Sequence, residues 1–322
     1  MSYSLLDYAA LVPSARASGV IQTFAESSPV LERLQMIDVG AAESYKYNVE
    51  TGLGGATWRA IGQNITADNG VISPAQENLS ILSRVVQIDR QRSKNADYKA
   101  AQIRMGSKAC ALTFTKDFFD GDQAVTPEQM HGLNARIGTG GALFRAIDES
   151  DATTNGGYMN LSIDVLEQAI DYVYGPNSEK MLLMSKLDRR LLSAALIQLG
   201  SDKIVLVQTN EGSRASRLVS HYDDVEIGII EDDASGAEIL GKDETRGSDD
   251  FTSSLYCVRF GRTEGEGVMG LHNAEGGTFE VEDRAGNATQ NETVIEGKVG
   301  MANFHARSFA RMSGIKNANY TA

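Results

Sequence analysis

The sequence is poor in the side chains that most often carry out chemistry. It has 2 cysteines and 4 histidines in 322 residues, and the histidines show none of the spacings of a zinc site. No GxSxG nucleophile elbow occurs, and neither cysteine lies in a local cysteine-protease signature. The sequence therefore predicts no catalytic residues, no metal ligands, no cofactor and no enzymatic activity.

Long apolar runs and positive charge are also scarce. No stretch of about 18 apolar residues occurs, so no membrane span is predicted. The net charge of −13 argues against a general nucleic-acid binder. Eight basic and two acidic residues lie between Arg84 and Lys116, whereas eleven acidic and two basic residues lie between Asp223 and Asp250. Such runs are usually solvated faces, but here they predict two different environments.

The first part of the chain consists of pieces too short to bury their own apolar residues. Within residues 1–42, short apolar segments are interrupted by Pro13 and Gly19, and Ser28 and Pro29 have the types expected at an N-cap and a first helical position. We interpret this segment as an arm that orders only on assembly.

Alternation then predicts a β-hairpin. Tyr45, Tyr47 and Val49 alternate with polar residues, a glycine-rich TGLGGA follows, and residues 57–59 are expected to begin the return strand. An isolated two-stranded hairpin is marginal in water. This one must therefore pack on its own chain or reach a neighbour.

A long helix is predicted from about residue 95 to Asp120-Gly121-Asp122. Helical spacing predicts that one of its faces is apolar, with the members Tyr98, Ala101, Met105, Ala109, Leu112 and Phe119. From residue 161, strand-like and helical runs alternate, which predicts a sheet with helical cover. Short β runs then lead back out of this compact unit.

The stretch DFFDGDQAVTPEQMHGLNARIG, residues 117–138, follows the long helix. Asp117, Asp120 and Asp122 are oxygen ligands, and Gly121 could turn the chain between them. A calcium loop, however, needs more oxygens in a fixed order, and the EF-hand pattern is absent. The alternative is a joint between two parts of a larger fold.

These segments together resemble the tailed-bacteriophage major capsid proteins of the Hong Kong-97 fold. The resemblance is closest to short-tailed-phage capsid proteins, whose long helix ends in an LFYGN…PE.F.GL..R pattern. Here the pattern reads Phe118-Phe119-Asp120-Gly121-Asp122, Pro127-Glu128 and Gly132-Leu133-Asn134-Ala135-Arg136. LLDYA, SPVLERL, ETGLGGATWRAIGQ and SLYCVRFG are further points of similarity. Asp120 and Asp122 depart from the family's Tyr and Asn, which affects the subfamily more than the fold.

The resemblance implies an α+β capsid fold, and it interprets residues 117–138 as the joint after a spine helix. The implied parts are an N-terminal arm (1–42), an extended β-hairpin loop (43–92), a peripheral domain with the spine helix (93–159), an α/β axial domain (160–268) and a C-terminal return to the peripheral domain (269–322).

The resemblance also implies a function and partners. The chain would self-assemble as hexamers and pentamers into the icosahedral head of a tailed phage, in the bacterial host cytoplasm, and become part of the virion. A separate scaffolding protein is expected because no built-in scaffolding segment precedes the arm. A portal, a possible decoration protein and double-stranded DNA are further expected partners, with weak non-specific contacts to DNA on an acidic lining. No membrane contact is expected.

Two groups of residues are candidates for contacts in such a shell. Trp58 and Arg59 suit an inter-subunit anchor because both types are enriched in interface hot spots, although most tryptophans pack inside their own subunit. The other inter-subunit candidates are Tyr45, Tyr47, Leu31 and Arg33. An acidic cluster near the capsomer axis, which salt or a cation could stabilise, would contain Asp223, Asp224, Glu231, Asp232 and Asp233.

Two alternatives remain open at this point. An encapsulin-type shell would have the same fold but enclose cargo protein, and DNA with a portal in purified particles would distinguish the phage head from it. A soluble α/β enzyme with a long substrate loop belongs to another class, and closed shells in the microscope would exclude a monomeric enzyme.

Overall fold

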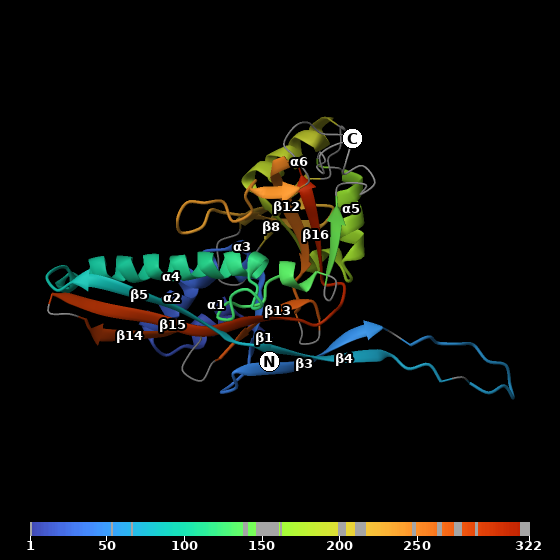
Figure 1. The fold of residues 1–322 in the computed structure, drawn as a ribbon, viewed down its shortest axis with the longest axis horizontal. Helices are drawn as coiled ribbons and strands as arrows, with labels where there is room; N and C mark the ends of the chain where they lie inside the picture. The colour runs from blue at the N-terminus through green and yellow to red at the C-terminus, as the bar shows by residue number, and fades with distance from the viewer. Residues whose placement is uncertain are drawn as a thin grey trace.

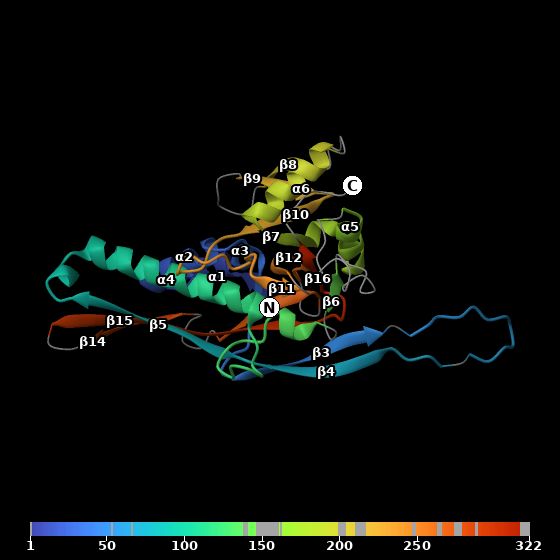
Figure 2. The ribbon, with the colours of Figure 1, turned by 45° about the horizontal axis from the view of Figure 1, so that its top comes forward.

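The computed structural model describes residues 2–52, 54–65, 67–137, 141–145, 161, 163–198, 204–209, 217–246, 249–262, 266–273, 279–286 and 289–315. An elongated part carries a compact domain on one side, and a hairpin projects from one end (Figures 1 and 2). The hairpin strands are β3 (Ser44–Gly52) and β4 (Val71–Asn78). The return strand thus begins at Val71, and the expectation that it begins at residues 57–59 is wrong.

The elongated part contains a six-stranded sheet. Its order is β1-β2-β13-β15-β14, and β5 also pairs with β15. The strands are β1 (Ser2–Ser4), β2 (Gln35–Asp38), β5 (Ser80–Asp89), β13 (Val268–His272), β14 (Glu280–Ala285) and β15 (Gln290–Asn303). The helices beside it are α1 (Leu5–Leu11), α2 (Ala15–Glu26), α3 (Pro29–Arg33), η1 (Arg92–Lys94), α4 (Ala96–Asp120) and η2 (Asn134–Arg136).

The predicted long helix is α4, and its start follows from a side-chain cap. The Asn95 carboxamide oxygen accepts hydrogen bonds from the backbone N–H groups of Asp97 (3.0 Å) and Tyr98 (3.3 Å). The predicted apolar face is wrong in part, because Met105 is 64% exposed and Ala101 is also exposed. Burial follows the two surfaces that cover α4, the sheet on one side and α2 on another. It therefore includes residues outside the predicted stripe, among them Ile103, Cys110, Phe114 and Phe118.

The arm packs on its own subunit, which contradicts the expectation that it orders only on assembly. Ile21 and Phe24 of α2 are fully buried in the core that α4 also lines, and Gly19 lies inside α2 without breaking it. Arg16 forms a bidentate pair with Asp283 of β14 (2.7 and 2.8 Å). The short helices α1, α2 and α3 thus bury their apolar faces by packing together on the rest of the subunit, which no single one of them could do alone.

An aromatic latch holds the first residues of the arm. Tyr3 Oη and His272 Nε2 share a 3.0 Å hydrogen bond, and the Tyr8 ring lies edge-on to the imidazole at 5.1 Å. His272 is fully buried on β13. Burial lowers the pKa of His272 from 6.5 to about 4, and the charge of Asp38 opposes this only in part.

The compact domain is an eight-stranded sheet covered by helices. Its order is β6-β16-β12-β7-β10-β9-β8, and β11 pairs with β12. Met181 and Leu183 of β7 face the core shared with the elongated part, whereas Leu182 and Met184 face α5 and α6. The strands and helices are β6 (Gly141–Arg145), β7 (Lys180–Ser185), β8 (Ile204–Thr209), β9 (Arg217–Tyr222), β10 (Val225–Ile230), β11 (Glu244–Arg246), β12 (Asp249–Arg259), β16 (Phe309–Ile315), α5 (Ile163–Tyr172), η4 (Asn177–Glu179) and α6 (Lys186–Gln198).

The C-terminal part of the chain differs from the expected division. Strands β13, β14 and β15 lie in the six-stranded sheet, but β16 lies in the compact domain between β6 and β12. It pairs in parallel with β6 and antiparallel with β12. The segment 269–322 therefore does not return to the peripheral domain alone, because the buried apolar residues of β16 complete the compact sheet.

The buried neutral imidazole makes subunit stability depend on pH. The folded state holds His272 unprotonated, so between pH 6.5 and about 4 the unfolded state binds more protons and stability falls as pH falls. A shift of this size corresponds to about 3 kcal/mol. We expect chemical denaturation followed by circular dichroism to show this loss in the wild type and a shallower pH dependence in His272→Gln. Parallel pH profiles for the two proteins would contradict the latch.

Candidate assembly interface

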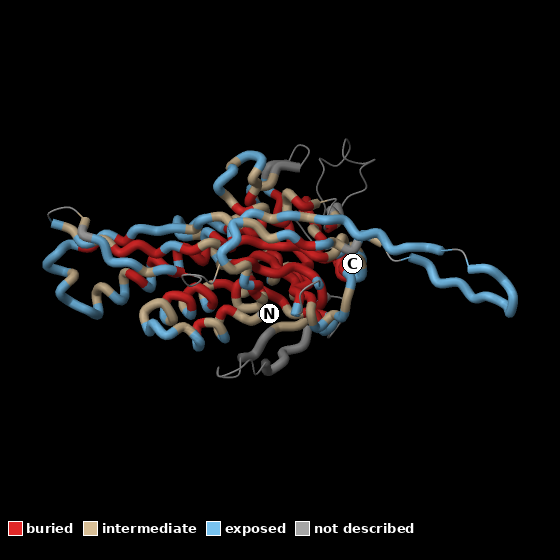
Figure 3. Tube along the Cα trace, turned by 90° about the horizontal axis from the view of Figure 1, so that it is seen from below, coloured by how far each residue is buried: buried red, intermediate tan, exposed pale blue. Residues whose placement is uncertain are grey.

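The hairpin tip exposes apolar side chains on a segment that its own subunit does not cover. Trp58 and Ile61 are completely exposed, with relative accessibilities of 104% and 106%, and Ile65 is 67% exposed. Figure 3 shows the hairpin as exposed along most of its outer length. The tip forms a few local hydrogen bonds. Gly55 N–H donates to Asp68 Oδ2 (2.6 Å), and Arg59 Nη1 donates to the Gln63 carbonyl (3.2 Å). Ala60 N–H donates to Gln63 Oε1 (3.3 Å), and Gln63 N–H donates to the Ala60 carbonyl (3.2 Å).

The base of the hairpin is fixed by aromatic packing. Tyr45 and Tyr47 stack at 5.9 Å, and Tyr47 packs on Phe304 at 4.8 Å. The predicted alternation of these tyrosines therefore serves attachment to the body, and Tyr47 is buried at 8% exposure. The base is therefore packed against the body of the subunit, whereas the tip is exposed.

Two further predicted contact residues lie in the arm and contact their own subunit. Leu31 is 1% exposed, so its side chain has almost no surface to offer a neighbour. Arg33 Nη2 donates to the Ser178 carbonyl (2.8 Å), and Arg33 Nε lies 3.8 Å from Glu226 Oε2. Of the six candidates, only Trp58 and Arg59 are exposed.

A buried ion pair joins the hairpin base to the joint. Arg136, 5% exposed, pairs through Nη1 with Glu77 Oε1 of β4 at 2.5 Å. Arg136 also donates to the carbonyls of His131 (3.0 Å) and Met301 (3.1 Å). Tyr47 Oη donates to the same Glu77 oxygen (3.2 Å). One guanidinium thus connects the hairpin, the joint and β15.

The sequence interpretation missed Glu77. It lies in a stretch that has no apolar alternation, and its partner Arg136 is 59 positions away. Arg136 itself was visible as the last residue of the motif PE…GLNAR. Burial, followed by the charge of Glu77, raises the pKa of Tyr47, so the phenol remains a hydrogen-bond donor.

The aspartate-rich stretch forms the joint between α4 and the compact domain. Asp120 accepts a hydrogen bond from Asn134 Nδ2, and Asn134 Oδ1 accepts one from Tyr256 Oη of β12 (2.8 Å). Burial raises the pKa of Asp120. These contacts tie the end of α4 to the compact domain. In the described part of the chain, no three His, Cys, Asp or Glu side chains come together as a metal site.

The joint requires glycine where two backbone segments cross. Gly132 N–H donates to the Gly121 carbonyl (2.8 Å). A Cβ on Gly121 would clash with the Met130 carbonyl, and one on Gly132 would lie 2.5 Å from the Asp117 carbonyl. The motif glycines therefore permit close approach of backbone to backbone.

The expected acidic cluster is divided between two places. Asp223 and Asp224 form the turn before β10, at left-handed φ values of 48° and 64°, whereas Glu231, Asp232 and Asp233 follow the far end of this strand. Six residues of strand separate the two groups by roughly 20 Å. Hydrogen bonds from Ser235 and Ala237 lower the pKa of Asp233, so this carboxylate holds a turn.

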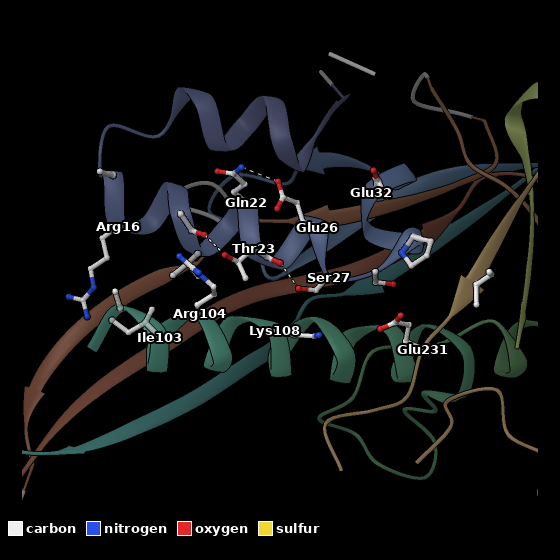
Figure 4. A pocket seen from close by; sticks show the side chains of 17 residues that line it. Arg16, Gln22, Thr23, Glu26, Ser27, Glu32, Ile103, Arg104, Lys108 and Glu231 are labelled. Atoms are coloured by element: carbon white, nitrogen blue, oxygen red, sulfur yellow. Dashed lines mark hydrogen bonds between the residues drawn. The ribbon is translucent and has the colours of Figure 1, made fainter. Parts of the chain in front are cut away.

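The basic segment is likewise not one face. Lys99 binds Asp283 (2.7 Å), whereas Arg104 and Lys108 line a groove of about 770 Å³ between α2 and α4, into which Glu231 also projects (Figure 4). The groove carries both signs of charge, since Glu26 and Glu32 of the arm lie on its other wall. Among the helices in the described ranges, none is long and apolar enough to cross a membrane.

Replacing Glu77 should destabilise the hairpin base. Glu77→Ala leaves the buried Arg136 charge without its carboxylate, which costs about 3 kcal/mol. The double variant Glu77→Ala/Arg136→Met should be more stable than Glu77→Ala alone, because the unpaired charge is gone. Glu43→Ala is the control, since its pair with Lys298 is exposed. Denaturation curves compare these three variants with the wild type, and a double variant no more stable than Glu77→Ala would contradict the coupled pair.

Comparisons with known proteins agree with this architecture. Residues 13–169 match the family described as Major capsid protein GP7. No curated protein matches the sequence. The fold resembles the holo-SrpI encapsulin of Synechococcus elongatus PCC 7942 (TM-score 0.61, 13% identity, 91% of this chain and 89% of that chain). It also resembles the capsid of a native GTA particle (TM-score 0.59, 11% identity, 90% and 91%).

A third similar structure is the procapsid of satellite phage P4, which includes a size determination protein (TM-score 0.54, 11% identity, 94% of this chain and 91% of that chain). At these identities the similarity concerns the fold, which is the expected mixed α+β capsid fold. The matched family is structural and non-enzymatic. The chain therefore has the Hong Kong-97 capsid fold and matches, over residues 13–169, a family of major capsid proteins.

Proposed function

We propose that this chain is the major capsid protein of a tailed phage, related to those of short-tailed phages, and that it self-assembles into an icosahedral head around double-stranded DNA. The observation that carries the proposal is the hairpin tip, where Trp58 and Ile61 are fully exposed while the base of the hairpin packs against the subunit. A subunit gains nothing by exposing these apolar side chains to water, whereas a neighbour that covers them gains their burial.

The proposed partners follow from the same assembly. Copies of the chain would form hexamers and pentamers, with a separate scaffolding protein, a portal and a possible decoration protein, in the host cytoplasm. The excess of 43 acidic over 30 basic residues suits a lining on which packaged DNA makes weak contacts. GTA and P4 particles are built from similar folds.

A second candidate is an encapsulin-type shell enclosing cargo protein, and the similarity to the SrpI encapsulin favours it. The two shells differ in content. Particles purified from the native source would contain DNA and a portal in the phage case, and cargo protein in the other.

Negative-stain microscopy of the purified protein tests whether the chain forms a shell. Closed icosahedral particles support a shell protein of either kind, and a chain that stays monomeric under all assembly conditions contradicts both.

The single tryptophan of the chain makes the hairpin contact measurable. Trp58 should fluoresce as a solvent-exposed tryptophan in free subunits and shift to shorter wavelength in shells, because a neighbour covers it. Trp58→Ala should remain folded by circular dichroism but form few closed shells, since the loss costs about 2 kcal/mol or more per contact. Val125→Ala, which removes another exposed apolar side chain, is the control. Normal shells from Trp58→Ala would show that the tip is not the tie between subunits.

A further inference from the structure

We propose that Asn69 is a site of spontaneous covalent modification in the hairpin. Its side-chain amide is lost through a succinimide formed with the backbone nitrogen of Gly70, which leaves aspartate or isoaspartate in its place. The site lies where β3 has ended at Gly52 and β4 begins at Val71. We call this part of the hairpin the neck and define it by Gly52, Gly54, Gly55 and residues 68–70. The effect that we infer on assembly rests on the proposed function, whereas the modification itself does not.

The reaction needs only the peptide and water. The Gly70 nitrogen forms a bond to the side-chain carbonyl carbon of Asn69 and gives up its proton, while the bond from that carbon to the amide nitrogen breaks and ammonia leaves. Water then opens the ring. Opening at the main-chain carbonyl gives isoaspartate, in which the main chain runs through the side chain and is longer by a methylene group. Opening at the other carbonyl gives aspartate.

The local sequence favours this ring closure at Asn69. Gly70 has no Cβ, and both residues are exposed and lie outside any helix or strand, so the backbone can adopt the conformations that bring the two atoms together. Asparagine side chains readily approach the backbone groups that follow them. The hairpin also contains Asn64 and Asn78, but each precedes a branched side chain that crowds the following nitrogen.

The attacking nitrogen is available. Within the residues that the structure describes, neither the Gly70 N–H nor the Asn69 side chain forms a hydrogen bond. A backbone N–H held in a strand ladder would first have to give up its bond. The neighbouring Asp68 is held differently, because its Oδ2 accepts the Gly55 N–H (2.6 Å). The reactive pair is therefore exposed beside a fixed residue.

The neck has little room for a longer main chain. A Cβ on Gly54 would lie 2.7 Å from the Asp68 carbonyl oxygen and 3.0 Å from the Gly70 nitrogen, so the two segments meet backbone to backbone. Isoaspartate lengthens one segment, and either product adds a negative charge next to Asp68. The outer part of the hairpin, with Trp58, is joined to the subunit through this neck (Figures 1 and 2). Modified subunits therefore present the tip differently and assemble less well.

Peptide mass spectrometry of the purified full-length chain tests the modification. A single tryptic peptide, residues 60–84, carries Asn69 together with Asn64 and Asn78, which serve as internal controls. During incubation at neutral pH, we expect Asn69 to lose its amide at least about tenfold faster than either control, which corresponds to about 1.4 kcal/mol in activation free energy. Gly70→Ala should slow the loss, because its methyl group crowds the nitrogen.

The sequence has a second Asn-Gly pair, Asn155-Gly156, outside the described residues, so the peptide 60–84 is followed on its own. Equal rates at its three asparagines would overturn the modification site. A Gly70→Ala chain that loses the amide as fast as the wild type would overturn it as well.

Ageing before assembly tests the consequence. Wild-type subunits aged in solution should give fewer closed shells than fresh ones, whereas Asn69→Gln, which cannot form the five-membered ring, should give the same yield before and after ageing. Equal losses in the two proteins would refute the effect on assembly and leave the modification site to the mass spectra. Absence of shells even from fresh wild-type subunits would instead refute the proposed function.

Discussion

The guanidinium of Arg136 is the point on which the arrangement of the elongated part depends. It is buried where the hairpin, the joint and β15 meet, and each of these segments supplies it with an acceptor. Arginine suits this place because its planar fork can satisfy several acceptors in fixed directions, and in a buried setting each bond is strengthened by the low dielectric. The direction of the hairpin is therefore set by the body of the subunit and not by the hairpin's own strands.

The base and the tip of the hairpin have different environments. Tyr47 and Glu77 hold the start of the hairpin in the subunit, whereas the tip around Trp58 has few contacts of its own. An exposed apolar group costs less entropy to bury when the segment that carries it already points in a defined direction. The arm differs from the hairpin because it packs on its own subunit. Phe24 is fully buried in the core that α4 also lines, so the arm stabilises the single subunit.

Much of the fold was predictable, because local patterns act over short distances. The α4 helix, its end before Gly121 and the first position of α3 at Pro29 all follow from periodicity and caps. Local patterns could not predict that the acidic cluster is divided or that Arg136 pairs with Glu77. Nearness in sequence did not bring Asp224 and Asp232 together, since a strand lies between them, and nothing local announces a partner 59 positions away. The place of β16 likewise depends on pairing with distant segments, β6 and β12.

The position of β16 has a consequence for how the chain is made. It lies between β6 and β12, yet it follows every other described strand in the chain. Until β16 has been synthesised, the edges of β6 and β12 that pair with it lack this partner. Unpaired strand edges invite pairing with other chains, including other copies of this one. The compact domain therefore closes only after β16 has been synthesised, and the interval before β16 inserts is when a nascent subunit most needs protection from its neighbours.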